Sequence, residues 1–522
     1  MLKKLHGRKL AVCLIGGAMY ALFSAFGWQA EHGGVIWAGG ALLVAALLVW
    51  PIAALLAVLL ERGYTRALRR EKTFRAGRAF AFILACYVPM FCVAFPGSFA
   101  YDVPYQLRQV VTGAYSTHHP LLHTLALGGL LQLGRALGDI NLGAALYTAL
   151  QMALLAGCFA LTCGSIARQS GARAAKRAAV FFALYPLNMV MAVNATKDVL
   201  FGGFFALTLA LLNEIQEKPS RGLALKIAAC GALAVMLRNN MAYAALVWLA
   251  LLTIGLRKGE KSAALAMLLA LAVGLCGNAA LKRATRAESG DMSEMLSWPI
   301  QQLARARLYD EDRLTDAEKE AIDELMPGEA WACYDPTISD PVKFEFDTQA
   351  FRADVKKYVG VWLSVGKKCA GTYLDATMAL TYPFFYPYRE YRVSGYYVQM
   401  GMSDAYDAGW CDFDPPESRS LFPRALASLS WRFGAKGAMQ IPVVGWLFNM
   451  GVIVWTMLFF ALREMYWGRW RRFGTALLPV LLWGTFLLGP VMAGRYIYPF
   501  VCALPVLAAR PGRSVKEAAR HG

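Results

Sequence analysis

Charged residues are scarce in this chain of 522 residues: Asp, Glu, Lys and Arg make up only 17%, whereas 57% of the residues are hydrophobic. A soluble domain usually carries about 25% charged residues, so this composition argues against a soluble globular fold. The apolar residues come in blocks of roughly 17–25 residues, the length that crosses a bilayer. Such blocks include Lys9–Phe26, Val35–Leu60, Ala79–Phe95, Gly143–Thr162 and Ser262–Leu281.

Several other features are missing. The chain has no Cys-x-x-Cys pair and no Cys/His cluster, which argues against a zinc site. No small-residue cleavage site is followed by a soluble domain, so we expect a retained first helix rather than a secretion signal. We find no internal repeat. Most of the 11 cysteines lie in or beside apolar blocks. In an oxidising compartment Cys333 and Cys411 are expected to pair, which leaves Cys369 as a free thiol.

The net charge of +18 is not spread evenly. The segment Lys282–Gly437 has 24 acidic and 19 basic residues, a net charge of −5, so the rest of the chain carries +23. The positive charge lies in short stretches between apolar blocks, and such basic loops face the cytoplasm. The basicity therefore indicates topology rather than nucleic-acid binding. The basic stretches are Glu61–Arg78, Ser165–Arg177, Arg257–Lys261, Arg463–Arg472 and Arg510–Arg520.

This pattern predicts an all-α integral membrane protein with about 12 transmembrane helices and both termini inside. Residues 1–281 form an N-terminal membrane module with a catalytic outer loop at 96–140. Residues 282–437 form a mixed extracytoplasmic segment, and residues 438–522 form the last helices and a basic tail. Within the outer loop, a full span at Leu121–Gly138 would put basic residues outside, so we interpret this stretch as re-entrant or interfacial.

Two long apolar stretches are interrupted by polar residues. Ala178–Ile215 is broken by Asn194–Asp198, and Leu223–Leu256 is broken by Arg238-Asn239-Asn240. We interpret each as a helical hairpin whose tip lies outside. In the outer segment, Thr315 and Glu318 fit a capping box for a helix at Thr315–Leu325. Asp354–Leu380 is an amphipathic stretch, followed by an aromatic run at Tyr382–Tyr388 that suits either sugar stacking or an interfacial aromatic belt.

The topology gathers polar residues at the outer ends of the spans. Ionisable groups at membrane depth are costly and usually functional. The main candidates are Asp102, His118, His119, Lys197, Asp198, Arg238 and Arg495, with Gln106 and Tyr496 as neighbours in sequence.

Each candidate has a functional and a structural interpretation. Asp102 could be a general base or hold a divalent cation, Mg²⁺ or Mn²⁺. It could instead cap the helix that starts near Pro104. His118 and His119 could bind phosphate or metal, or simply precede a helix started by Pro120.

The remaining cations have the same two interpretations. Lys197 and Asp198 could neutralise each other, although we assign Lys197 to the substrate and Asp198 to the helix start. Arg238 and Arg495 could grip phosphate through their planar forks, or serve as interfacial anchors.

These motifs together resemble the GT-C superfamily of membrane glycosyltransferases, in layout the protein O-mannosyltransferases and the lipid A aminoarabinose transferases. The similar elements are Tyr101–Gln106 around Asp102, His119-Pro120-Leu121-Leu122, the hairpin Ala195–Phe201 and Arg495-Tyr496-Ile497-Tyr498-Pro499. Two positions differ. Val103 follows Asp102 where the mannosyltransferases have Asp-Glu, and His119 replaces a lysine.

The resemblance implies an inverting transfer from a polyprenyl-phosphate-linked sugar to an envelope glycan, lipid or protein on the outer side of a bacterial inner membrane. Asp102 would be catalytic, and His119, Lys197, Arg238 and Arg495 would bind the donor phosphate. Two other functions stay open: a transporter or flippase of a lipid-linked anion, which broken helices also suit, and a non-catalytic envelope assembly protein.

Overall fold

The computed structural model describes residues 5, 7–32, 40–62, 73–100, 102–252, 258–387, 398, 400–402, 415–434 and 441–510. Within these ranges the protein is built from helices, and the residues described include isolated bridges between loops but no strand. The expectation of an all-α protein is confirmed. The outer segment, which we expected to be mixed, is helical in its described residues.

Among the residues that the structure describes, six helices are long and apolar enough to cross a membrane. They include the five apolar blocks predicted from the sequence, and the sixth is the second half of the first broken stretch. The other predicted spans correspond to shorter helices, so a total of about 12 stays a prediction. The six are α1 (Arg8–His32), α2 (Gly40–Arg62), α3 (Ala76–Ala94), α6 (Ile140–Ser170), α9 (Lys197–Glu217) and α12 (Lys258–Thr285).

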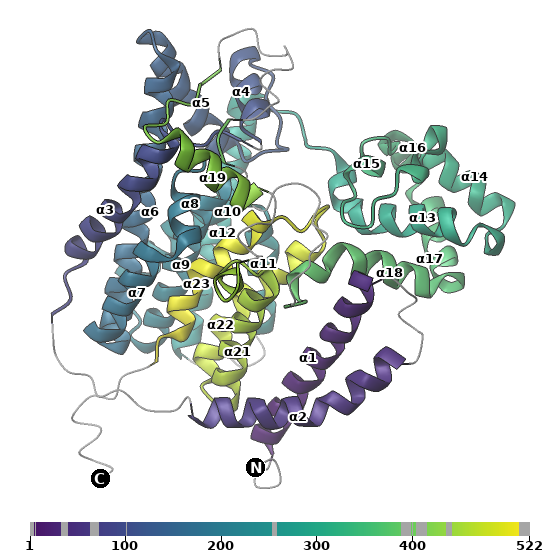
Figure 1. The fold of residues 1–522 in the computed structure, drawn as a ribbon, viewed down its shortest axis with the longest axis horizontal. Helices are drawn as coiled ribbons and strands as arrows, with labels where there is room; N and C mark the ends of the chain where they lie inside the picture. Colours follow the sequence, from purple (N-terminus) through teal and green to yellow (C-terminus); the bar gives the residue numbers. More distant parts are fainter. Residues whose placement is uncertain are drawn as a thin grey trace.

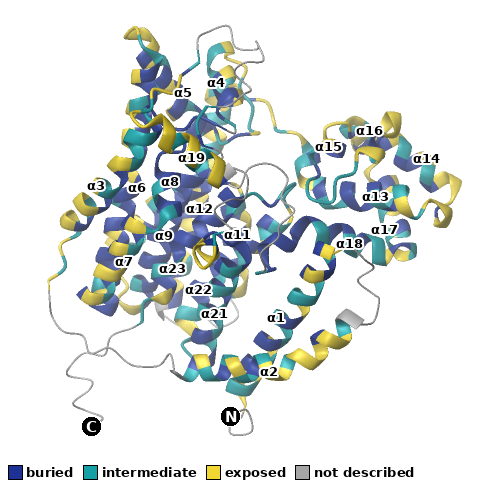
Figure 2. Ribbon diagram, in the orientation of Figure 1, coloured by how far each residue is buried: buried dark blue, intermediate teal, exposed yellow. Residues whose placement is uncertain are grey.

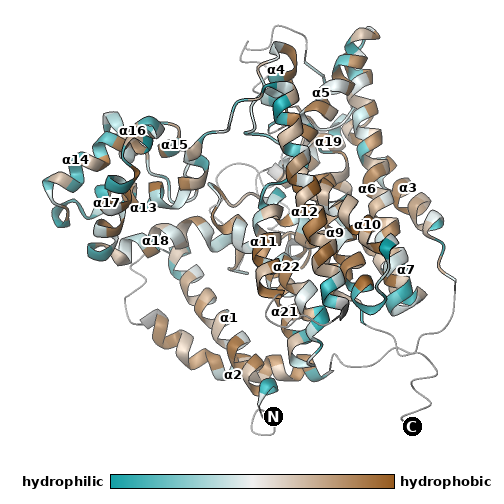
Figure 3. Cartoon of the chain, turned by 180° about the vertical axis from the view of Figure 1, so that it is seen from behind, coloured by the Kyte–Doolittle hydropathy of each residue, from teal (hydrophilic) through white to brown (hydrophobic). Residues whose placement is uncertain are grey.

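The helix bundle is apolar on its outside as well as in its core. Leu47 on α2 and Leu265 on α12 are both 68% exposed. Seen from behind, α12 is hydrophobic along most of its length (Figure 3). A soluble monomer rarely exposes such continuous apolar surface, whereas a lipid-facing helix requires it. By contrast α9 lies at the centre, where most of its residues are buried (Figure 2).

Both broken stretches are interrupted in the predicted regions, but the first has a further break at Tyr185, and Lys197 and Asp198 form the first turn of α9 rather than part of the break. The first stretch forms α7 (Ala172–Leu184), α8 (Pro186–Ala192) and α9, with the break at residues 193–196. The second forms α10 (Arg221–Leu237) and α11 (Asn240–Leu252), with Arg238 as the C-cap of α10. The interruptions therefore place polar side chains and free helix ends together at one end of the bundle.

The outer loop between α3 and α6 contains α4 (Val103–Thr112) and α5 (Leu121–Ala136). With 16 residues, α5 is about 24 Å long, which is shorter than a bilayer core. The end of α5 packs so closely against the start of α6 that small residues are needed at the contact. A Cβ atom added at Gly134 would lie 2.3 Å from the backbone nitrogen of Gly143. The length of α5 fits a re-entrant or interfacial helix.

Residues 292–381 form a helical unit with a hydrophobic core of their own, here called the outer domain. The predicted capping box at Thr315 and Glu318 is present. The amphipathic stretch is divided at Cys369, a buried free cysteine. Cys333 is exposed, and Cys411 lies outside the described residues, so their pairing stays a prediction. The domain's helices are α13 (Ser297–Tyr309), α14 (Asp316–Leu325), α15 (Asp340–Lys343), α16 (Thr348–Ala353), α17 (Val355–Lys368) and α18 (Ala370–Thr381).

The aromatic run after α18 differs from both expectations. Tyr382, Phe384 and Phe385 are buried rather than exposed as a sugar platform or a belt. The Phe385 ring stacks on Phe23 of α1, with ring centroids 4.8 Å apart. The run therefore joins the outer domain to the bundle.

Three helices complete the bundle: α21 (Met450–Tyr466), α22 (Trp470–Leu487) and α23 (Tyr498–Ala508). The described chain begins and ends at one end of the bundle, here called the terminal end (Figure 1). The helices α4 and α5 lie at the opposite end, here called the outer end, together with α19 (Pro423–Gly434).

Candidate functional site

Asp102 is at the N-cap position of α4, but its side chain makes no capping hydrogen bond. Its backbone carbonyl instead accepts the amide of Gln106 at 3.0 Å. The carboxylate is 23% exposed and points to two cations from distant parts of the chain. The structural alternative, a carboxylate that serves as a helix cap, therefore does not describe what this side chain contacts.

The two cations are Lys197 and Arg495. Lys197 Nζ donates to Asp102 Oδ2 at 3.0 Å. Arg495 Nη1 donates to the same oxygen at 3.0 Å, and Nη2 lies 3.5 Å from Oδ1. Lys197 starts α9, and Arg495 lies in the 3₁₀ turn Gly494–Ile497 that leads into α23. One carboxylate thus joins three segments that are up to 393 residues apart in sequence.

His119 completes the group around Asp102. Its Nδ1 lies 3.7 Å from Asp102 Oδ2 and is buried without a hydrogen-bond partner among the described residues. The neighbouring His118 points elsewhere: it is half exposed and lies 4.0 Å from Glu294 in the outer domain. The histidine pair therefore divides, and only His119 belongs to the site.

A second ion pair lies behind the first. The fully buried Asp198 contacts Arg238 and accepts a hydrogen bond from the Thr196 hydroxyl at 3.2 Å. The guanidinium of Arg238 also stacks near two aromatic rings, 4.4 Å from the centre of Phe486 and 4.5 Å from that of Tyr496. Asp198 at the start of α9 also suits the positive end of the helix. Lys197 and Asp198 therefore do not neutralise each other, because each has a different partner.

The Asp198 and Asp102 pairs meet at Arg495. Its Nε lies 3.9 Å from Asp198 Oδ2, while its Nη atoms face Asp102. The cluster has three permanent cations and two carboxylates, an excess of one positive charge. Such an excess in a partly buried place favours an anionic ligand.

A chain of buried hydrogen bonds supports Asp102 from below. Gln106, one turn after Asp102, is 3.0 Å from His123 Nδ1 and donates to Thr124. His123 Nε2 lies 2.9 Å from the Tyr147 hydroxyl, which donates to Gln151. This network fixes the position of α4 against α5 and α6.

The same chain reaches the loop that carries Lys197. The Gln151 amide donates to the backbone carbonyls of Ala192 and Asn194, at 3.0 and 2.9 Å. His123, Tyr147 and Gln151 were not among the residues predicted from the sequence. The signal for Tyr147 and Gln151 was their spacing of four residues, which puts both on one face of α6. His119 precedes α5, so no helical spacing marks His123.

Backbone pairing holds the two loops together. Ser98 donates its amide to Val193, and its carbonyl accepts the amide of Ala195, both at 2.8 Å. On its other side, the Phe99 amide donates to Gly401 at 2.9 Å. The segments before Asp102 and before Lys197 are therefore fixed relative to each other.

The outer domain contacts the segment that precedes Arg495. The Trp298 indole donates to the carbonyl of Leu487 at 2.6 Å. The Ser339 amide donates to Pro490 at 2.9 Å. The domain thus braces the turn from which Arg495 extends.

Burial and neighbouring charges act on Asp102 in opposite directions. Burial by itself raises the pKa of Asp102, but the positive charges of Arg495 and Lys197 outweigh it and hold the pKa well below the usual value. Burial, reinforced by Lys197, lowers the pKa of His119 to about 3. At neutral pH Asp102 is therefore a carboxylate, and His119 is a neutral imidazole that can offer a hydrogen bond but no charge.

The donors around Asp102 do not suit a divalent cation in this arrangement. Both carboxylate oxygens face cations, and a metal would have to displace them. Among the described residues no group of three or more His, Cys, Asp or Glu side chains could hold a metal ion. The arrangement is better suited to an anionic group such as phosphate, for which lysine and arginine are the usual partners.

The comparisons with known proteins give one match. Residues 111–521 match the model of a family of unknown function, DUF6020. The match includes His119, Lys197, Arg238 and Arg495, whereas Asp102 and Gln106 precede it. No curated protein and no solved structure matches the chain.

Proposed function

We propose a function for this chain, which belongs to the DUF6020 family: it is a membrane glycosyltransferase that uses a polyprenyl-phosphate-linked sugar. The observation that carries the proposal is the convergence of Lys197, Arg495 and His119 on the partly exposed carboxylate of Asp102. A sugar transfer from a lipid phosphate needs an acid-base group beside a phosphate-binding group, and this cluster offers both.

In the proposed reaction an acceptor hydroxyl attacks the anomeric carbon of the donor sugar. The bond between that carbon and the phosphate oxygen breaks, and the lipid phosphate leaves with the electron pair. Asp102 takes the proton of the hydroxyl. Lys197, Arg495 and Arg238 stabilise the negative charge that develops on the phosphate, a kind of contact typically worth about 3–4 kcal/mol. Attack on the face opposite the leaving phosphate inverts the configuration at the anomeric carbon.

The low pKa of Asp102 makes it a weak base while its partners stay in place. The donor phosphate would compete with Asp102 for Lys197 and Arg495. Once the phosphate holds these cations, the carboxylate loses two stabilising charges and its basicity rises. The substrate would thus create the base that the reaction needs, and the acceptor would be deprotonated only when the donor is bound.

His119 and Asp198, which lie beside the cations, would have separate roles in the reaction. The unpartnered Nδ1 of the neutral His119 could hydrogen-bond the phosphate or the sugar. Asp198, which binds Arg238 at the base of the cluster, would position that arginine rather than touch the substrate. No step is assigned to a divalent cation, because the donors around Asp102 do not suit one.

A transporter or flippase of a lipid-linked anion is the second candidate. The broken stretches that end at residues 193–196 and at Arg238 favour it, because interrupted helices commonly line transport sites. The cluster lies at the outer end of α9 rather than at its middle, which favours the enzyme. An assembly protein without catalysis would not need ionisable groups from four segments to meet.

The experiment uses the purified full-length protein in proteoliposomes. A polyprenyl-phosphate sugar is supplied with envelope extract as acceptor, and transferred sugar is measured by mass spectrometry. We expect a glycosylated product and released polyprenyl phosphate. Movement of the intact donor across the bilayer without release of polyprenyl phosphate would overturn the enzyme and favour the flippase. In parallel, cells that lack the protein should lose one sugar modification from their envelope glycans.

A further inference from the structure

One face of α17 in the outer domain is apolar and exposed. Val355, Val359 and Leu363 follow at intervals of four residues, so they lie in one stripe along the helix. They are 43%, 40% and 50% exposed. Met295, close in sequence to the domain's core, is 66% exposed. A stripe of this kind on an otherwise acidic domain calls for an apolar partner.

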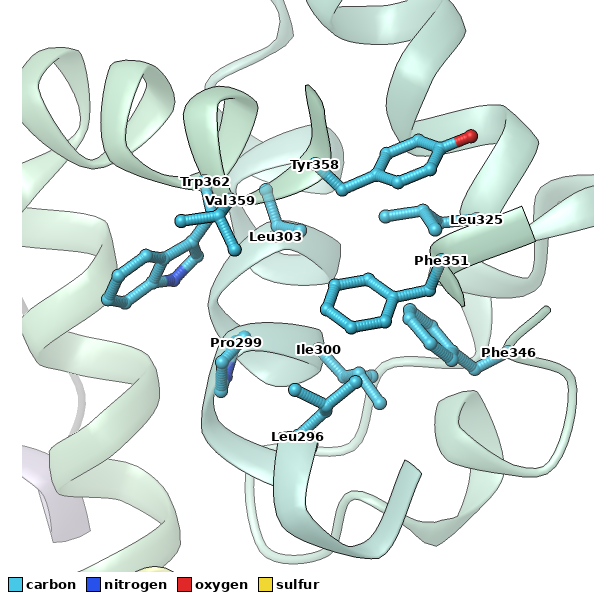
Figure 4. Close-up of a pocket in the computed structure, with 10 residues that line it drawn as sticks. All are labelled: Leu296, Pro299, Ile300, Leu303, Leu325, Phe346, Phe351, Tyr358, Val359 and Trp362. Atoms are coloured by element: carbon cyan, nitrogen blue, oxygen red, sulfur yellow. The ribbon is translucent and has the colours of Figure 1, made fainter. Parts of the chain in front are cut away.

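A cavity of about 150 Å³ opens behind this stripe (Figure 4). Its lining side chains come from α13, α14, α16, α17 and adjoining turns, and they are apolar apart from the hydroxyl of Tyr358 and the indole nitrogen of Trp362. Val359 belongs both to the cavity and to the exposed stripe. The exposed stripe therefore continues into the apolar interior of the domain.

The position of α17 relates it to the membrane. The segment after α18 packs on the last turns of α1, where Phe385 stacks on Phe23 and Tyr386 lies against Gly27. Trp28, which follows Gly27 on α1, is 54% exposed, and this exposure suits an indole at the level of the lipid head groups. In Figures 1 and 3, α17 and α18 form the part of the outer domain nearest α1. The helix α17 thus lies on the side of the outer domain toward the end of α1 that carries Trp28.

The lysines of α17 divide into two pairs. Lys357 and Lys368 bind Glu324 and Glu318 within the domain. Lys356 and Lys367 make no ion pair with any described residue, and helical spacing puts both beside the apolar stripe. A helix with an apolar stripe flanked by free lysines is typical of a segment that lies in the plane of an anionic membrane surface.

We propose that α17 docks the outer domain onto the outer leaflet of the bilayer. Val355, Val359 and Leu363 enter the boundary between head groups and acyl chains. Lys356 and Lys367 bind the phosphates of anionic phospholipids. The cavity behind Val359 accepts the end of one acyl chain. This anchoring holds the domain, and with it the turn before Arg495, at a fixed height above the bilayer. The proposal does not depend on sugar transfer.

The test uses the full-length protein in lipid nanodiscs. An environment-sensitive fluorescent amino acid replaces Leu363, and the nanodiscs contain phosphatidylcholine with or without phosphatidylglycerol, plus lipids with a nitroxide on the upper acyl chain. Since interfacial helices are buried roughly 5–10 Å deep, the nitroxide should quench about half or more of the emission. The same probe at Glu320, an exposed position on α14, is the matched control and should keep its emission.

Charge reversal tests the lysines. In the Leu363 probe protein, the double change Lys356→Glu and Lys367→Glu should reduce the quenching in nanodiscs that contain phosphatidylglycerol. Equal quenching at Leu363 and Glu320 would overturn the proposal, as would quenching that the double change leaves unaltered. A blue-shifted Leu363 probe that nitroxide lipids do not quench would show that protein, such as a second copy of the chain, covers the stripe instead, and would also overturn it.

Discussion

Two buried groups of charges lie at the two ends of α9, and they are built differently. The outer group surrounds Lys197 and Asp198 at the start of the helix, and the terminal group lies near Glu217 at its end. The helix has 21 residues, so the groups are separated by about 30 Å, the thickness of a bilayer core. The two groups differ in how completely their charges are paired within the protein.

The terminal group is closed. Arg463 binds Glu464 at 2.6 Å and the carbonyl of Leu507 at 2.7 Å, and both charged side chains are only 4% exposed. Arg472 donates to the carbonyl of Ala509 at 2.7 Å. These arginines hold the carbonyls at the end of α23, which have no partners within the helix. Each of these charged groups has a partner within the protein, so few of their hydrogen-bonding atoms are left for a ligand.

The outer group is open. Lys197, Arg495 and His119 all approach Asp102, the carboxylate that remains partly exposed. Nδ1 of His119 has no hydrogen-bond partner among the residues the structure describes. Buried polar atoms nearly always have a hydrogen-bond partner, so the unpartnered Nδ1 of His119 is an exception that a ligand would explain. This contrast leads to predictions that separate stability from activity.

The largest expected effect is on stability at the terminal group. Glu464→Gln removes the carboxylate between Arg463 and Arg469. Removal of one partner from a buried pair typically costs about 3–5 kcal/mol. The unfolding midpoint in detergent should fall clearly, while the folded fraction keeps its specific activity. The surface change Glu320→Gln, at an exposed position on α14, is the control and should leave the midpoint unchanged. Normal stability of Glu464→Gln would remove the distinction between the two groups.

The largest expected effect on activity is that of Asp102→Asn. The Asp102 side chain makes no capping bond, so the change costs α4 no cap. It does remove the negative charge that takes the proton, which should slow transfer by roughly 100-fold or more. The release of polyprenyl phosphate from the donor measures the rate of transfer. The unfolding midpoint checks that the variant is folded. Full activity of this variant would contradict the mechanism.

Arg495→Lys gives a smaller effect. Lysine keeps the charge but lacks the planar fork by which Arg495 presents two nitrogens to one carboxylate or phosphate. Transfer should fall about tenfold, chiefly through weaker use of the donor. The matched change Arg463→Lys at the terminal group should lower the unfolding midpoint and leave the use of the donor unchanged. If both variants behaved alike, the outer arginine would have only a structural role.

The smallest effect concerns His119 and pH. Its pKa is about 3 in the folded protein against an ordinary value of 6.5 for histidine, so the unfolded chain binds the extra proton first as pH falls. Stability should therefore decrease below pH 6.5, by about 1.4 kcal/mol per pH unit for this one histidine. Unfolding midpoints at pH 7.5 and 5.5 measure it. His119→Gln should remove this part of the pH dependence, and an unaltered dependence would show that His119 is not buried as a neutral ring.

Much of the architecture follows from the sequence. The long apolar helices, the interruptions at residues 193–196 and at Arg238, and the capping box at Thr315 occur where the sequence places them. The number of spans beyond the long helices, the side of the membrane and the disulfide stay predictions. The aromatic run was interpreted as an exposed surface, but its rings are buried because the outer domain folds back onto α1.

The sequence alone therefore determined which long apolar segments are helical, the regions where they break and which ionisable residues lie near their ends. These properties depend on apolar length, helix caps and the cost of burying charge, all of which act locally along the chain. Only the tertiary structure decided the pairing: Lys197 with Asp102, Asp198 with Arg238, and His119 rather than His118 at the site. Such pairs depend on the rotation and tilt of whole helices. Packing among many helices sets those angles, and no single segment contains that information.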